Sequence, residues 1–156
     1  MKKPSEYAVS AMRALGVTVE PNQNMLRQIG VLGEACYFCE PPTGFPDVAE
    51  KWGGSNAILA RVNFATTLAT GRIRGAKPDY EKLLADLPAR EAEVITDRLT
   101  QILVGIPLDP QTQGSIEKTI ARARAQSKGK RRKANFKEAA GFLAALILGS
   151  PDFQMR

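Results

Sequence analysis

The chain has 156 residues, of which 44% are hydrophobic and 24% are charged, a composition typical of one folded domain. It contains no histidine, which removes the commonest general base and metal ligand and every catalytic arrangement that needs one. The net charge of +6 comes from one segment, because residues 118–137 hold nine basic and no acidic residues, against 13 basic and 16 acidic elsewhere. Whether the chain is an enzyme stays open, but binding is expected more than catalysis.

Helical periodicity covers most of the sequence. A helix is predicted over 5–15, and a second from Asn22, as its N-cap, to a stop at Gly33. A third is predicted over 57–71, capped by Ser55 and Asn56, with an apolar stripe made of Ile58, Leu59, Val62, Ala65 and Ala69. Further helices are predicted from Pro78 or Asp79 past Leu84, from Pro88 to Gly105, from Gln111 or Ser115 up to the basic segment, and over 134–148.

The stretch from Gly33 to Ser55 has neither helical nor alternating periodicity. It contains both cysteines and the only tryptophan, and irregular segments this long are uncommon inside a compact domain unless they are functional or disordered. Since it is too aromatic for a disordered linker, we expect an ordered loop held between helices by Tyr37, Phe38, Phe45 and Trp52.

These patterns predict an all-α fold, an irregular bundle of about six to seven helices in a single domain over 1–156, with one long ordered loop over 33–55. No membrane span is expected, because the longest apolar run, residues 139–148, is half of the roughly 20 residues that cross a bilayer. The first residues include a proline and a glutamate where the apolar stretch of a signal peptide would stand, so no signal peptide is predicted.

Four stretches together resemble one known family. They are KPSEYAVSAMRALG near the start, PPTGFPDVAEKW and AILARVNFA in the middle, and GSPDFQMR at the end. In this order they are similar to the C-terminal region of the bacterial family catalogued as domain of unknown function 1800. The resemblance implies longer, mostly helical relatives of roughly three times this size, often exported. It implies no agreed reaction, cofactor or catalytic residue, and it leaves the compartment of this chain unknown.

The residues within the matching stretches have two interpretations. In the first, Arg61 is architectural, because a guanidinium satisfies the carbonyl groups of an irregular backbone. In the second, Arg61, Trp52 and Asp47 form an anion or sugar site, with the tryptophan as a stacking platform and the carboxylate available for hydrolysis. Sequence alone favours the first interpretation and leaves the second open.

Two further patterns are candidate binding or redox sites. Cys36 and Cys39 have the spacing of a redox pair, but prolines follow and no strand precedes, so packing of the loop is favoured over a disulfide, and no metal site is expected. The run of Lys128, Lys130, Arg131, Arg132 and Lys133 is interpreted as a solvated loop, with contacts to a nucleic acid as the functional alternative.

The sequence therefore predicts an uncharacterised helical module that packs against another protein and needs no cofactor. The expected partners are the N-terminal part of a longer relative or a second copy of the chain. The first alternative is a basic nucleic-acid-binding protein that uses residues 128–133. The second alternative is a hydrolase-like, anion or sugar site around the loop at 33–55.

Overall fold

The computed structural model describes residues 1–20, 22–35, 39, 42, 44–46, 48–127 and 135–155. Regular structure in these residues is almost entirely helical, so the fold is all-α as predicted. The elements are α1 (Pro4–Ala14), β1 (Thr18–Val19), α2 (Gln23–Val31), a 3-10 helix (Ala49–Trp52), α3 (Ser55–Ala69), β2 (Ala76–Lys77), α4 (Tyr80–Leu83), α5 (Ala92–Leu103), α6 (Pro110–Ser127), α7 (Phe136–Gly149) and α8 (Pro151–Gln154). The two very short strands pair antiparallel, with Thr18 opposite Lys77.

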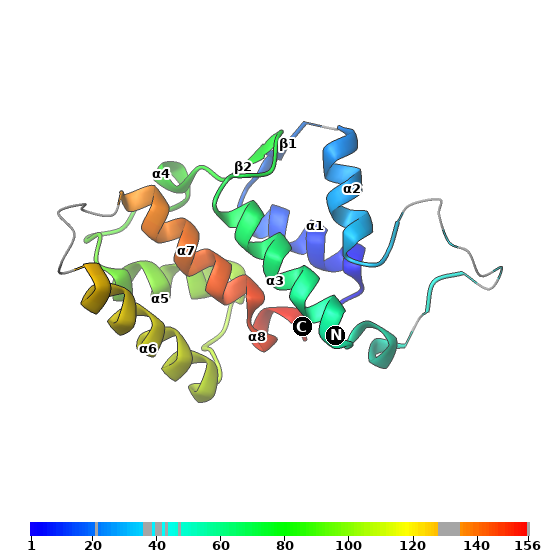
Figure 1. Ribbon diagram of the computed structural model, residues 1–156. Coiled ribbons are helices and arrows are strands. Elements are labelled where there is room, and N and C mark those ends of the chain that lie inside the picture. Colours follow the sequence, from blue (N-terminus) through cyan, green and yellow to red (C-terminus); the bar gives the residue numbers. More distant parts are fainter. Residues whose placement is uncertain are drawn as a thin grey trace.

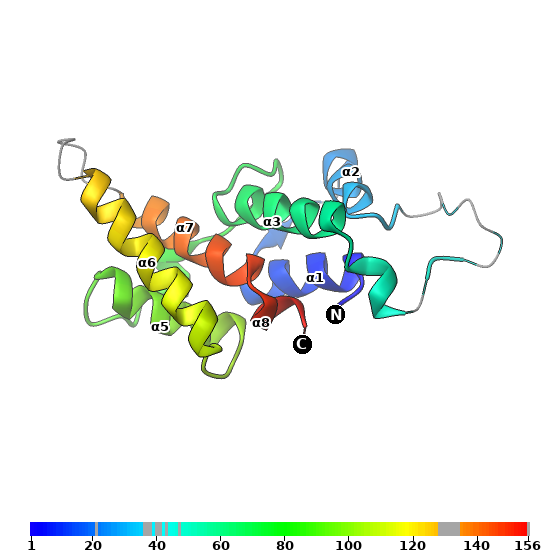
Figure 2. The ribbon, with the colours of Figure 1, turned by 60° about the horizontal axis from the view of Figure 1, so that its bottom comes forward.

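Helices α3 and α7 lie side by side at the centre of the fold (Figure 1). Their backbones approach closely, because a Cβ added at Gly141 of α7 would lie only 2.8 Å from the carbonyl oxygen of Ala69 in α3. Helices α1 and α5 lie behind α3 and α7 in Figure 1 and below them in Figure 2. The bundle therefore has two layers, and α6 crosses in front of α5 in Figure 2.

The two ends of the chain meet beside α8 (Figure 1). The backbone nitrogen of Lys2 donates to the carbonyl oxygen of Gln154 at 2.8 Å. The last helix predicted from the sequence ends at residue 148, but a short helix that was not predicted starts at Pro151, and Phe153 is buried against the Tyr7 ring, with centroids 5.7 Å apart. Proline at the first position of a helix explains the start.

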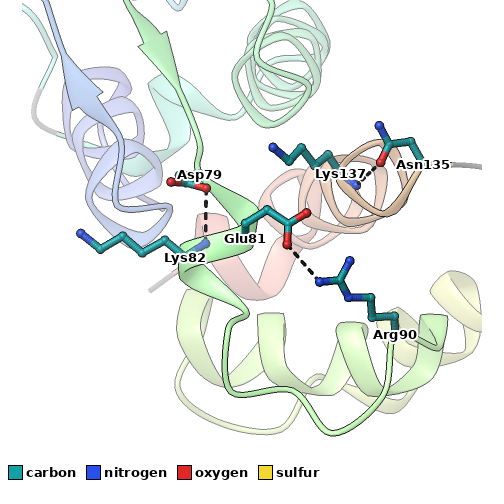
Figure 3. Close-up of polar contacts among 6 residues, drawn as sticks. All are labelled: Asp79, Glu81, Lys82, Arg90, Asn135 and Lys137. Atoms are coloured by element: carbon teal, nitrogen blue, oxygen red, sulfur yellow. Dashed lines mark hydrogen bonds and ion pairs between the residues drawn. The ribbon is translucent and has the colours of Figure 1, made fainter.

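Two side chains predicted to begin helices do so, whereas α3 has Gly54 as its N-cap in place of Ser55 or Asn56. Asn22 accepts a hydrogen bond from the backbone nitrogen of Met25 at 3.0 Å, and Asp79 from that of Lys82 at 3.3 Å (Figure 3). The helix predicted from Pro88 starts only at Ala92. In the intervening segment Arg90 forms an ion pair with Glu81 at 3.0 Å (Figure 3), and its guanidinium carbon lies 4.2 Å from the centre of the Phe136 ring.

The inward face predicted for α3 was partly wrong. Ile58, Leu59 and Val62 are 41%, 59% and 37% exposed. The core instead receives a face rotated around the helix, made of Arg61, Phe64, Ala65, Leu68 and Ala69. The helix is apolar on both sides, so its periodicity alone does not say which side faces the core.

Candidate functional site

Arg61 is the largest fully buried side chain of the described residues. Its Nη2 donates to the carbonyl oxygen of Lys2 at 2.7 Å, and its guanidinium carbon lies 5.2 Å from the centre of the Tyr7 ring. Nε and Nη1 have no hydrogen-bond partner among the described residues. Burial lowers the pKa of the Arg61 guanidinium, since a charge loses its hydration there.

A second cation lies next to this guanidinium. The Lys2 ammonium donates to the carbonyl oxygen of Phe153 at 2.7 Å and stands 3.7 Å above the Phe153 ring. Burial, followed by the nearby charge of Arg61, lowers the pKa of Lys2. The Tyr7 hydroxyl lies 3.0 Å from the carbonyl oxygen of Leu148, and burial raises the pKa of this hydroxyl. These contacts tie the N-terminal residues to α3, α7 and α8.

Trp52 closes the loop against the end of α2. Its indole Nε1 donates to the carbonyl oxygen of Pro46 at 3.0 Å, and its ring centre is 6.3 Å from that of Phe45. A Cβ added at Gly33 would lie 3.5 Å from the indole, so the ring packs on this glycine. Trp52 is therefore buried by the protein itself.

The predicted ligand site around the loop stays a prediction. The contacts described for Arg61 and for Trp52 share no residue, and Asp47 lies outside the described residues. Tyr37, Phe38 and Cys36 also lie outside them, while Cys39 is half-buried. Among the residues that the structure does describe, no three carboxylate, thiol or imidazole side chains come together in a way that could hold a metal ion.

The five cations of the basic run, from Lys128 to Lys133, all lie outside the described residues. At the edge of the run, Arg124 of α6 forms a bidentate pair with Glu93 of α5, with distances of 2.7 and 2.8 Å. The hydrogen bonds from Arg124 lower the pKa of Glu93. This arginine is therefore engaged within the fold.

The outer side of α3 carries no charge. The only charged residue of this helix is Arg61, which is buried. The exposed part bears four polar side chains, those of Ser55, Asn56, Asn63 and Thr66, around the three exposed aliphatic ones. Helix α7 borders this side of α3, because Val62 Cγ2 lies 3.6 Å from the position that a Cβ of Gly149 would take, and Phe142, two turns earlier on α7, is 43% exposed. We call Ile58, Leu59, Val62 and Phe142 the α3 face.

A groove of about 680 Å³ separates the first turns of α6 from the junction of α7 and α8. The backbone nitrogen of Asp109 donates to Asp152 Oδ1 at 3.3 Å, and both aspartates line the groove. Asp109 Oδ1 accepts from the backbone nitrogen of Gln111 at 2.8 Å, at the start of α6. Asp152 Oδ2 is enclosed and has no hydrogen-bond partner in the described part of the chain.

The sequence did not predict this pair of aspartates. Each aspartate lies next to a proline, Asp109 before Pro110 and Asp152 after Pro151, and such pairs mark helix starts. That signal places each residue locally. It does not say that the two helix starts lie side by side, since they are separated by more than forty residues and by two long helices.

Comparison with known proteins assigns the chain to a family. A family model described as a protein of unknown function, DUF1800, matches residues 1–155. Searches of curated proteins and of solved structures found no match. None of the helices that the structure describes combines the length and the apolar composition needed to span a membrane.

Proposed function

Because the chain belongs to the DUF1800 family, whose function is unknown, its role must be inferred from its own surface, and we propose that it is a non-catalytic helical module that binds protein through the α3 face. The observation that carries this proposal is the absence of charge on the outer side of α3, in a protein with 24% charged residues. The centres of protein interfaces are depleted in charged side chains, whereas ordinary surface helices carry them.

The packing of α7 supports the same proposal. This helix is apolar around nearly its whole circumference, and such helices are normally buried on all sides. In this fold α3, α4, α5 and α8 cover most of α7, but Phe142 remains exposed. Large apolar side chains exposed on two neighbouring helices are typical of an interaction surface.

We propose that the partner is a second copy of the chain. A side chain placed against Leu59 loses its water, so a charged group there would have no compensating contact on α3. The outer side of a second α3 meets this requirement, because it is equally free of charge. Each chain has a net positive charge, but the α3 face itself has none. A two-fold contact between two α3 faces therefore places no like charges opposite each other.

Sedimentation velocity over a wide range of concentrations tests this proposal. The native chain is expected to dimerise, and Leu59→Glu is expected to shift it to monomer, since each copy would bury a carboxylate against an apolar surface. Leu26→Glu on α2 is the matched control, because Leu26 is 57% exposed and should leave dimerisation unchanged. A native chain that stays monomeric at every concentration, as a module docking onto a longer relative would, contradicts the proposal.

A second candidate function uses the basic segment. Residues 118–137 carry nine positive and no negative charges, which favours contacts with phosphate groups. We propose nucleic-acid binding by Lys128, Lys130, Arg131, Arg132 and Lys133 as this alternative. Replacing these five residues by glutamine is expected to abolish binding to a random duplex at low salt. Binding that persists in this variant, or that does not weaken with salt, argues against it.

A further inference from the structure

We propose that the groove between α6 and the α7–α8 junction is a binding site for a small organic cation with an apolar body. The inference does not depend on the α3 face, because the groove is lined by α6, α7, α8 and the residue before α6. Its volume of about 680 Å³ lies within the range of sites that hold small molecules, roughly 300–1,000 Å³.

The walls of the groove provide an apolar surface. Ile116 of α6 lies on one side and Leu146 of α7 on the other, with Pro151 and Met155 at the C-terminal end. Ile116 is buried beneath the surface, whereas Met155 is 60% exposed. A methionine side chain adapts its shape to a bound apolar group, so the groove fits a flexible hydrocarbon better than a rigid polar ligand.

Three of the four hydroxyl groups that line the groove already donate to backbone carbonyl oxygens. Ser115 Oγ donates to the carbonyl oxygen of Gln111 at 2.8 Å, Thr119 Oγ1 to that of Ser115 at 2.8 Å, and Ser150 Oγ to that of Ile147 at 2.7 Å. The charged groups of the groove are the two carboxylates.

The charge of the groove selects the ligand. Asp109 and Asp152 are its only charged lining residues, although the chain as a whole carries a net charge of +6. Neither carboxylate forms an ion pair within the described residues, and Asp152 Oδ2 accepts no hydrogen bond there. The start of a helix ordinarily attracts anions, but Asp109 already occupies that position on α6, so an anionic ligand would be repelled. An ammonium or guanidinium group supplies the opposite charge that the pair lacks.

Three probes that share one hydrocarbon chain test this inference: hexylammonium, hexanol and hexanoate. Titration into the native protein, followed by amide NMR shifts, is expected to give saturable changes around Thr112, Ser115 and Met155 with hexylammonium. Hexanol should bind about fivefold more weakly, the effect of losing one partly exposed ion pair. Hexanoate should not bind.

Two pairs of variants locate the binding. Ser115→Arg places a large cation in the groove and should abolish hexylammonium binding, whereas Ala121→Arg adds the same charge to an exposed position of α6 that does not line the groove. Asp152→Asn should weaken binding about fivefold, and Asp97→Asn, an exposed change on α5, should not. Equal binding of all three probes, preference for hexanoate, or binding that survives Ser115→Arg would overturn the inference.

Discussion

Arg61 shows what a single residue contributes when its charge has no counterion in the described structure. Only one of its nitrogens, Nη2, has a hydrogen-bond acceptor, and the Tyr7 ring covers the guanidinium. Burying an unpaired charge costs free energy, and the apolar stem of the side chain recovers part of it by packing. The sequence pointed to this residue through the stretch AILARVNFA, but periodicity placed it on the polar side of α3. A buried arginine is too rare for a helical pattern to anticipate.

This balance predicts different effects of two substitutions at the same position. Arg61→Met keeps the volume and removes the buried charge, so the free energy of unfolding should change by less than about 1.5 kcal/mol. Arg61→Ala leaves a cavity and should cost about 3 kcal/mol. Urea denaturation of both variants measures the difference. If methionine is as costly as alanine, the contacts of the guanidinium with the Lys2 carbonyl oxygen and the Tyr7 ring stabilise the fold by more than burial of the charge costs.

At the scale of elements, the close contact of α3 and α7 is the feature on which the bundle depends. Tyr80 of α4 also joins it, because its hydroxyl donates to the Ala69 carbonyl oxygen at 2.8 Å. The same oxygen lies where a Cβ of Gly141 would fall. Glycine at position 141 is therefore required by the spacing of two backbones, while its backbone φ is ordinary for a helix.

Two alanine substitutions separate this packing effect from helix propensity. Gly141→Ala should lower the free energy of unfolding by about 2 kcal/mol, because the new methyl group meets backbone that cannot move aside. Gly114→Ala, in α6, meets nothing within 4 Å and should raise stability by about 0.5–1 kcal/mol. Thermal melts of the two variants should therefore shift in opposite directions. A stabilising Gly141→Ala would show that the two helices can separate at little cost.

The helix boundaries are the part of the fold that the sequence was sufficient to predict. Local signals mark many of the helix ends. They are the N-caps Asn22 and Asp79 and the three stops Gly16, Gly33 and Gly105, and each of these glycines has a positive φ. The helices that these residues bound were predicted within a few residues. The orientation of α3 was not predictable in this way, since aliphatic residues occur around most of its circumference. The groove needs still more information, because it is formed by two helix starts that only the packing of α7 brings together.

For the whole molecule, two deeply buried hydroxyls connect the layers and make the fold sensitive to alkaline pH. Tyr7 of α1 lies within hydrogen-bond distance of carbonyl oxygens of α3 and α7, and Tyr80 of α4 donates to α3. Burial raises the pKa of both hydroxyls above the ordinary value of 10.0. In the unfolded chain both groups return to that ordinary value. The neutral hydroxyls therefore contribute stability that is complete below pH 10 and is lost as the pH rises further.

The free energy of unfolding should therefore fall above about pH 10, by about 1.4 kcal/mol per pH unit for each tyrosine. Lys2 acts in the opposite direction, because its lowered pKa makes the fold gain stability up to its unfolded value of 10.5, and it adds nothing beyond that. Urea denaturation at about pH 9 and about pH 11 measures the net slope. Tyr80→Phe should lower stability at both pH values and roughly halve the slope. If the native chain is equally stable at both pH values, one or both hydroxyls ionise within the fold, and the tyrosines do not hold the layers together as described.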